Sequence, residues 1–506
     1  MHKARSLMVW AFALGSYWLP SSASASPLQD LAGDTASSAA MQARTLAGGS
    51  GAAYFNPALL TVAPSGVHIG FFVLNQQYGI ALDGRPGTQF AIPEGVENFG
   101  HMGGGRFDNY PIATNLLQFG RMKDARTEAF EARPRQGAGS GHKLLTYETV
   151  GIVVKMYKDR LALGFHGLIP NGEFTKMRAF FNDEREQYFS NSLHPELYSD
   201  RMTAVSMALA LGLKLTDQLS IGAGATIALK AGVGAGAYVA DTGNLGKIQL
   251  AMDASVNIGI SPHFGVSFNP TPRLHLTATA HSPQQVEMVA DFKFLLANGI
   301  EQSSGLRFLL DYTPWQVGAG AAYDLIQEEH ESLTVAGNAL FAAWSTYIDR
   351  HGDRPSPAYA WSDTLSPTVG ARYRYHKIST SLDLMYMPTP VPQQTGRTNY
   401  VDNDRVTTGL GAEYSFELFG SNMKVGAQLH VHRLVPRDQV KLLTPTRPDG
   451  ANLAPERVKD ELPDDAQRSG QPVAGAGGLQ TNNPGWPGFS SGGWITGGAL
   501  YLSVAL

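Results

Sequence analysis

The chain has 506 residues, no cysteine and a formal net charge of −4 at pH 7, and only 16% of its residues are charged. Because the net charge is small, we expect no nucleic-acid partner, and without cysteine neither disulfides nor thiolate metal sites can form. A secreted chain of this length without disulfides needs another source of rigidity, which a closed β-barrel would supply.

Residues 1–25 have the features of a secretion signal. Lys3 and Arg5 are positive, residues 7–19 form an apolar core, and Ala23-Ser24-Ala25 matches the small-x-small cleavage pattern. The apolar core is shorter than the roughly 20 residues of a spanning helix, and no later apolar run reaches that length. We therefore expect the mature chain to begin near Ser26, outside the cytoplasm.

Residues 26–63 are rich in small side chains and end shortly after Asn56-Pro57-Ala58. From residue 64 onward the pattern changes to period two, as in residues 203–215 and 254–268, where apolar residues alternate with small or polar ones. Strands with one apolar and one small or polar face suit a sandwich or a membrane barrel. The lengths of the connections separate these two folds.

The alternation predicts fourteen strands, at about residues 64–75, 147–157, 160–168, 203–215, 219–230, 254–268, 273–294, 314–324, 332–344, 366–376, 378–388, 405–416, 422–433 and 494–506. Tight turns alternate with long connections, of which the longest are at about residues 76–146 and 434–493. Short periplasmic turns and long extracellular loops are typical of outer-membrane barrels. The predicted fold is therefore an all-β, 14-stranded antiparallel transmembrane β-barrel over residues 64–506.

The strand count bears on the lumen. Eight strands leave an interior filled by side chains, and sixteen to eighteen leave an aqueous channel. A 14-stranded barrel should therefore leak unless something fills it. Residues 26–63 precede the first strand without sharing its alternation, so we expect them to form a plug inside the barrel.

Two sequence blocks resemble one family. The run AGDTASSAAMQARTLAGGSGAAYFNPALL, residues 32–60, resembles the N-terminal hatch of the FadL/TodX-type outer-membrane transporters of long-chain fatty acids and hydrocarbons. The block from Tyr386 to Tyr414 is similar to the family's Pro-Val-Pro loop followed by an Asp-x-Asp-Arg strand start. Pro390-Val391-Pro392 and Asp402-Asn403-Asp404-Arg405 carry this match.

The resemblance implies a monomer in the outer membrane of a Gram-negative cell, in contact with its lipid. Its ligand would be a hydrophobic small molecule such as a fatty acid or hydrocarbon, taken up by diffusion without a cofactor. Residues 26–63 would be the hatch, and Asn56, Pro57 and Ala58 its latch to the wall; by themselves these residues also fit a simple turn. This chain ends in Val504-Ala505-Leu506 rather than the aromatic residue usual in the family, and its longest loops are longer than usual.

A kink in the family's third strand opens the wall sideways, beside the Asn-Pro-Ala end of the hatch. Pro170, Asn171 and Gly172 are the corresponding residues in this chain, because proline lacks the N–H that a strand ladder needs and glycine often marks a bend. The alternative is that the strand ends at Pro170 and an extracellular loop begins. Both interpretations remain open from the sequence.

Several charged residues have two interpretations as well. Asp402, Asp404 and Arg405 either order the extracellular rim or form ordinary turn and surface pairs. Arg372 and Arg374 share a strand face that should point into the lumen, either because charge is expensive on the lipid side or because they bind a carboxylate headgroup. His430 and His432 also share a face, but no third ligand is near in the sequence, so we expect no metal.

Nothing in the sequence indicates an enzyme. A His-Glu-x-x-His pair is absent, and the one Gly-x-Ser-x-Gly match, residues 488–492, ends a glycine-rich loop instead of joining a strand to a helix. We therefore expect no catalytic residue. Two alternatives to the transporter stay open: a general porin with an unplugged lumen, and a surface adhesin or receptor that uses the long loops. A barrel-embedded lipase is a distant third.

Overall fold

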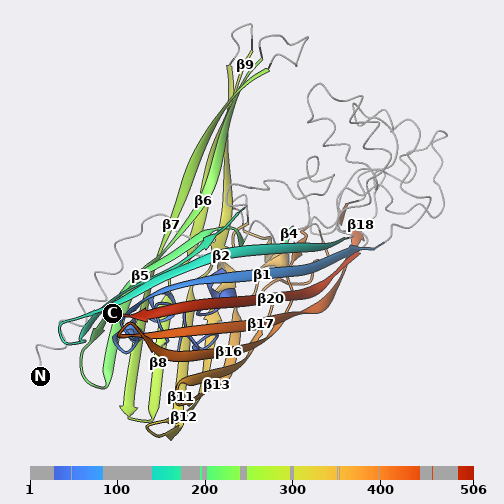
Figure 1. Ribbon diagram of the computed structural model, residues 1–506. Helices are drawn as coiled ribbons and strands as arrows, with labels where there is room; N and C mark the ends of the chain where they lie inside the picture. The colour runs from blue at the N-terminus through green and yellow to red at the C-terminus, as the bar shows by residue number, and fades with distance from the viewer. Residues whose placement is uncertain are drawn as a thin grey trace, which may run out of the picture.

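The computed structural model describes residues 28–46, 48–83, 139–172, 194–195, 202–239, 248–296, 301–349, 352, 354–396, 398–444, 458–459 and 488–506. The signal-peptide prediction lies outside these residues. The described chain is mostly β-strand, arranged as a tilted barrel with a projecting arm (Figure 1).

The helices are short: α2 Leu28–Ala32, α3 Ala52–Phe55, η1 Pro57–Thr61, η4 Trp344–Thr346 and η5 Pro357–Tyr359. The strands of the barrel and arm are β1 Gly66–Leu82, β2 Gly139–Met156, β3 Leu161–Pro170, β5 Val205–Lys214, β6 Leu219–Val239, β7 Ile248–Thr271, β8 Leu274–His281, β9 Gln284–Leu296, β10 Glu301–Thr313, β11 Gln316–Gln327, β12 Glu331–Ala342, β13 Thr364–Tyr375, β14 Ile378–Met387, β16 Arg405–Leu418, β17 Ser421–Val440 and β20 Gly488–Ala505. Two small parallel pairs lie outside the barrel: β4 His194–Pro195 with β15 Tyr400–Val401, and β18 Leu443–Thr444 with β19 Val458–Lys459.

Fourteen strands close into an antiparallel ring, in the order β6-β5-β3-β2-β1-β20-β17-β16-β14-β13-β12-β11-β8-β7 and back to β6. The first and last strands pair over their whole shared length, from Gly66 opposite Ala505 to Leu82 opposite Phe489. The predicted strand number and antiparallel barrel are therefore confirmed. Closure leaves no free sheet edge in the wall.

The strand predicted over residues 273–294 is wrong in its extent, because it breaks at Ser282-Pro283. Proline cannot donate to the ladder, and β8 ends at His281 while β11 takes the place beside it. The next residues form the hairpin of β9 and β10, which the alternation did not predict. β9 pairs in parallel with the distal part of β6, at Ala235–Val239, so β6, β7, β9 and β10 form the projecting arm (Figure 1).

The two longest connections are shorter than predicted. β1 continues to Leu82 and β2 begins at Gly139, so the first connection covers residues 83–138 instead of 76–146. β17 likewise continues to Val440 and β20 begins at Gly488. The apolar alternation stops at Asn75-Gln76-Gln77 while the backbone pairing goes on, since pairing does not require an apolar face.

The strands alternate between a buried and an exposed set of side chains. In β7, Val256, Ile258, Ile260 and Phe264 are 52–62% exposed on the outside, whereas the inward-facing Ser261 and His263 are buried. The predicted tight turn between β2 and β3 is also present, with Tyr157, Lys158 and Asp159 at positive φ. In β7 the outer face is thus apolar and the inner face is polar or small.

Candidate functional site

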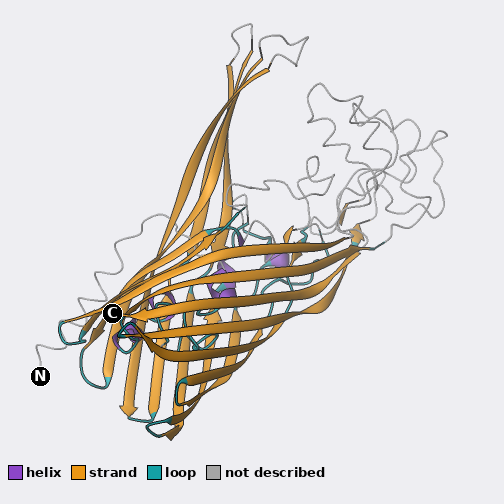
Figure 2. Ribbon diagram, in the orientation of Figure 1, coloured by secondary structure: helices purple, strands orange, loops and turns teal. Residues whose placement is uncertain are grey.

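The described N-terminal residues, 28–46 and 48–63, lie within the ring of strands, where their short helices appear behind the wall (Figure 2). Nearly all of them are buried, and Leu28, Ala53 and Ala58 have no exposed surface. Their polar groups bond to residues on ten of the fourteen strands; nine of these residues contribute an inward-facing side chain, and Val266, whose side chain lies on the outer face, contributes only its backbone carbonyl. These wall residues are His166 on β3, Ser206 on β5, Ser220 on β6, Val266 on β7, His281 on β8, Gln316 on β11, Asn338 on β12, Arg372 on β13, Asp383 on β14 and Gln428 on β17.

Asn56 ends α3 and caps η1, and it is fully buried. Its side-chain Nδ2 donates to the carbonyl of Arg44 at 3.1 Å and to that of Val266 on β7 at 3.4 Å. Its Oδ1 accepts from the backbone N–H of Ala58 at 3.2 Å. One amide therefore joins three places: the preceding N-terminal chain, the barrel backbone and the next helical turn.

Three wall glycines lie against the Asn56-Pro57 end. A Cβ added to Gly265 would come within 2.0 Å of Asn56 Oδ1, and one added to Gly222 within 2.4 Å of the Pro57 carbonyl carbon. At Gly212 the nearest atom would be the Pro57 carbonyl oxygen, at 2.7 Å. The wall thus receives this end of the segment at positions where any side chain would displace it. Glycine at inward positions of three successive strands was the sequence signal for this contact, and sequence reasoning missed it.

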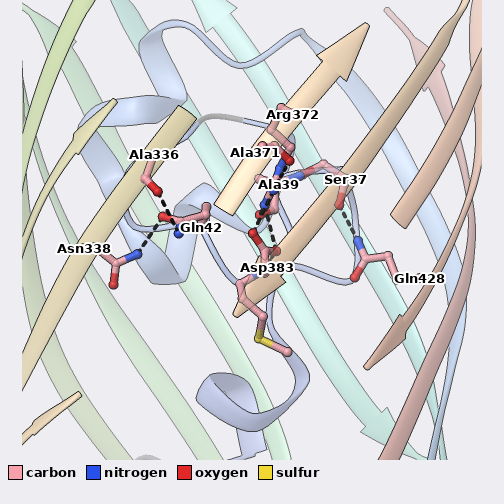
Figure 3. A network of polar contacts seen from close by, with 10 residues as sticks. Ser37, Ala39, Gln42, Ala336, Asn338, Ala371, Arg372, Asp383 and Gln428 are labelled. Atoms are coloured by element: carbon pink, nitrogen blue, oxygen red, sulfur yellow. Dashed lines mark hydrogen bonds and ion pairs between the residues drawn. The ribbon is translucent and has the colours of Figure 1, made fainter. Parts of the chain in front are cut away.

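Arg372 points inward and is already engaged (Figure 3). Its guanidinium forms a bidentate ion pair with Asp383, at 2.8 and 2.9 Å, and its Nη2 also donates to the carbonyl of Ala39. Asp383 in turn accepts from the backbone N–H of Met41 at 3.2 Å. Arg372 therefore has a structural partner on the wall and holds the N-terminal segment. Asp383, the one acidic residue of an otherwise apolar and hydroxylic strand, was missed as that partner.

Two amide side chains, one on β12 and one on β17, extend this contact (Figure 3). Asn338 donates to Gln42 Oε1 at 2.8 Å, and Gln428 donates to the carbonyl of Asp34 at 2.7 Å and to that of Ser37. Asp34 itself is buried and bonds to Ser37 and to the N–H of Ala36. Burial is the main cause that raises the pKa of Asp34 from 3.8 to about 6, against the opposing effect of these hydrogen bonds.

One side of the N-terminal segment faces apolar residues. We call this set the apolar lumen cluster; it consists of Leu28, Leu31, Ala32, Phe72, Leu74, Tyr78, Leu145, Tyr147, Leu168, Met202, Val401, Leu434, Phe489, Ile495 and Ala499. Most of its wall members lie on β1, β2 and β20. The segment therefore combines the polar contacts described above with an apolar contact through α2.

The remaining predicted residues lie apart from this contact. Arg374 is exposed near the turn and bonds to Ser332 and to the Glu329 carbonyl. Thr389 donates from its hydroxyl to Asp402 at 2.7 Å and from its N–H to Asp404 at 2.8 Å, so both carboxylates bond to the same loop residue. Arg405 points inward instead, opposite Leu434 of the apolar lumen cluster.

Pro170 is the last residue of β3. Its ladder with β2 extends to Tyr147 and by one more bond from Asn171 to Thr146, and its ladder with β5 ends at Leu168. A Cβ at Gly172 would meet nothing within 4 Å. Gly212, which receives Pro57, pairs with Ala162 at the other end of β3. The predicted lateral opening thus lies away from the Asn56-Pro57 end, and it stays a prediction.

The structure also places the Gly-x-Ser-x-Gly match and the two neighbouring histidines of β17. The Gly-x-Ser-x-Gly match, residues 488–492, forms the start of β20, with Ser490 opposite Ala81. His430 and His432 are buried, with Nδ1 and Nε2 2.7 Å apart. In the described part of the chain no group of three or more His, Asp or Glu residues is arranged to hold a metal ion.

The helices of the described residues have at most five residues each, and none of them is long and apolar enough to cross a membrane. No protein-family model matches the sequence, and no curated protein matches it.

Solved structures of similar fold exist. A Pseudomonas aeruginosa FadL homologue covers 96% of this chain and 98% of its own, at 15% sequence identity and a TM-score of 0.51. The CymD monoaromatic hydrocarbon channel has 12% identity and a TM-score of 0.46, and the P. putida toluene transporter TodX has 13% and 0.45, with 94–99% of each chain covered. In fold, therefore, this chain resembles the FadL-type barrel.

Proposed function

We propose that this chain is an outer-membrane transporter that takes up hydrophobic compounds, such as long-chain fatty acids or hydrocarbons, through a barrel whose lumen holds an N-terminal hatch, residues 26–63. The observation that carries the proposal is the contact of residues 28–63 with ten strands of the wall. A water-filled pore of porin type is hard to reconcile with an interior occupied in this way.

The membrane location is supported by the outer face. Large apolar side chains such as Ile258, Phe264, Leu384 and Leu410 are more than half exposed on it. A soluble protein rarely leaves such a continuous apolar surface in water, whereas lipid covers it at no cost. A Gram-negative outer membrane is the site we propose, and a monomer is the simplest assembly because the barrel closes on itself.

The route begins at the extracellular side. A hydrophobic ligand would adsorb at the loops, pass into the apolar lumen cluster beside α2, and continue when the hatch shifts. The Pro170-Asn171-Gly172 end of β3 is our proposed lateral opening for the exit. Asn56, Pro57 and Ala58 are proposed as the latch, since Asn56 bonds to both the hatch and the wall. No step requires catalysis or a cofactor.

The apolar side of the lumen gives the reason for the ligand class. Fully burying a Leu- or Phe-sized group is worth about 1.5–3 kcal/mol, so a hydrophobic ligand that replaces contacts between α2 and β1 keeps most of this stabilisation. A polar ligand would not. Arg372 is paired with Asp383, which leaves it a structural role and argues against its use as a headgroup receptor.

Two measurements on one preparation test the proposal. The purified protein is reconstituted into vesicles, and both the entry of an apolar fluorescent probe and the ion conductance in planar bilayers are recorded. We expect probe entry together with low conductance, and high conductance after deletion of residues 28–61. High conductance in the full chain would instead identify a general porin. Normal probe entry after shortening the 83–138 and 441–487 connections would separate transport from an adhesin role.

A further inference from the structure

Several histidines of the wall contact the hatch, and their bonding partners differ in chemistry. His263 on β7 donates to the carbonyl of Ala53 at 2.7 Å. His166 on β3 meets the Ser50 hydroxyl at 3.2 Å. A carbonyl accepts from either form of imidazole, and a hydroxyl can accept or donate. Both contacts therefore survive protonation of the ring.

His281, the last residue of β8, has a different partner. Its Nε2 lies 3.1 Å from Nη1 of Arg44, and a guanidinium has five N–H donors and no acceptor. Nε2 must therefore carry the lone pair that accepts from Arg44, so this contact exists only with a neutral imidazole. Protonation at Nε2 would place an N–H and a positive charge against another N–H and positive charge.

Arg44 is the centre of the hatch contact. It is 6% exposed, it forms an ion pair with Asp30 of α2 at 2.6 Å, and it donates to Gln316 on β11 at 3.3 Å. Its carbonyl accepts from Asn56, the latch residue. A displaced Arg44 would therefore disturb α2 and the Asn56 end together.

The other described groups that face His281 are two rings, one backbone group and a carboxylate that already has other partners. His263 stacks on its ring at 4.9 Å, and Tyr54 of α3 meets it edge-on at 5.0 Å. His281 also bonds to the backbone of Phe55. The nearest carboxylate, Asp30, is engaged by Arg44 and by Gln316, which donates to it at 2.9 Å.

We propose that Arg44 is the positioning residue that keeps the hatch closed and that neutral His281 is its required acceptor, so that acidification favours opening. The proposal rests on the proposed hatch function. An imidazole in water has a pKa near 6.5. The closed arrangement excludes the protonated ring. The closed hatch therefore has its full stability above that pH and loses stability as the pH drops below it.

One other hatch group acts in the opposite direction. The pKa of Asp34 is raised to about 6 by burial, so the closed hatch binds its proton more tightly than an exposed carboxylate would. Acidification from above pH 6 to below it therefore protonates Asp34 and stabilises the closed hatch. The test must for this reason compare variants at His281 with the unmodified chain, rather than rely on one pH profile.

The experiment measures ion conductance of the full chain in planar bilayers at pH 7.5 and 5.0, with no hydrophobic compound present. Because the readout is leak through the lumen, it is independent of whether the chain transports any particular ligand. A single protonation changes the ratio of open to closed forms by at most about tenfold per pH unit. We expect the acid-to-neutral conductance ratio of the unmodified chain to exceed that of His281→Gln by about threefold or more, since glutamine stays neutral and can accept from Arg44.

The variants separate positioning from folding. Arg44→Met should raise the conductance at pH 7.5 and abolish the difference that His281→Gln makes, whereas Arg44→Lys should restore low conductance in part. The matched control is His275→Gln, on the same strand, where the histidine bonds to Asn269 and Asp324 at 3.0 and 3.1 Å and not to the hatch. Heat-dependent mobility on gels verifies that each barrel is folded. Equal pH ratios for the unmodified chain and His281→Gln would overturn the proposal, as would low conductance in Arg44→Met.

Discussion

The side chain of Asn56 donates to the carbonyl of Val266, 210 positions later in the chain, at 3.4 Å. This bond attaches the end of the N-terminal segment to β7, while a second bond from the same amide group holds Arg44. From the sequence alone Asn56 fits a turn, but in the structure it also bonds the segment to the barrel.

Replacing Asn56 with Ala should lower uptake of an apolar probe while the barrel still assembles. The change removes two donors and one acceptor, so the carbonyls of Arg44 and Val266 and the N–H of Ala58 lose their bonds to this side chain, and each buried group left unsatisfied costs about 1–3 kcal/mol. Asn56→Asp is the informative comparison, because it keeps the acceptor for Ala58 and loses the bonds to Arg44 and Val266. Uptake equal to that of the unmodified chain at equal expression would reduce Asn56 to a turn residue.

Adding a methyl group at Gly222 should displace the Asn56-Pro57 end and increase ion leak several-fold. The new Cβ would lie 2.4–2.6 Å from three atoms of Pro57 and Ala58, closer than atoms can approach. Gly337→Ala on β12 is the matched control, because its nearest neighbour would be 3.6 Å away. Planar-bilayer conductance of the two variants gives the comparison, and indistinguishable leak from both would contradict the close contact.

Breaking the ion pair between Arg372 and Asp383 should loosen the hatch. The side chain of Asp383 is 1% exposed, and leaving one buried charge without its partner costs about 3–5 kcal/mol. Arg372→Met should therefore make the segment more sensitive to protease and raise leak. The double variant Arg372→Met with Asp383→Asn should recover part of the loss, since no uncompensated charge remains. No recovery in the double variant would show that the bond to the Ala39 carbonyl matters more than the ion pair.

Closing the end of β3 tests the lateral opening. Pro170→Val with Gly172→Ala restores a ladder donor and stiffens the chain at the position where pairing with β5 has ended. Loss of uptake with intact folding and intact binding of ligand at the surface is the expected result if compounds leave through this side. Unchanged uptake would show that β3 simply ends there and that the exit lies elsewhere.

The barrel was predictable because its strands obey period two wherever one face is apolar. The prediction failed where that contrast fades: Asn75-Gln76-Gln77 has no apolar residue although β1 continues, and Pro283 divides a stretch that alternates on both sides of it. Periodicity reports the contrast between two faces rather than backbone pairing itself.

The site was less predictable than the fold. Asn56 could be selected from its motif, but its partners, Val266 and Arg44, are ordinary residues that contribute only carbonyl groups. Arg372 was selected from its strand face, yet Asp383 could not be assigned to it without knowing the register between β13 and β14. Arg405 was grouped with the rim carboxylates beside it in the chain, although alternation along β16 turns it inward.

The measurement that tests the central claim most directly is a reversible cross-link between hatch and wall. The hydroxyls of Thr61 and Ser220 lie 3.0 Å apart, so cysteines at these two positions would bring their sulfur atoms close together, and the chain has no cysteine of its own. In the Thr61→Cys/Ser220→Cys variant we expect the bond to form on oxidation, probe uptake to fall to the background of empty vesicles, and reductant to restore it. Either single variant serves as the control. Full uptake through the completely cross-linked protein would contradict a hatch that must move, and failure of the bond to form would contradict its place in the lumen.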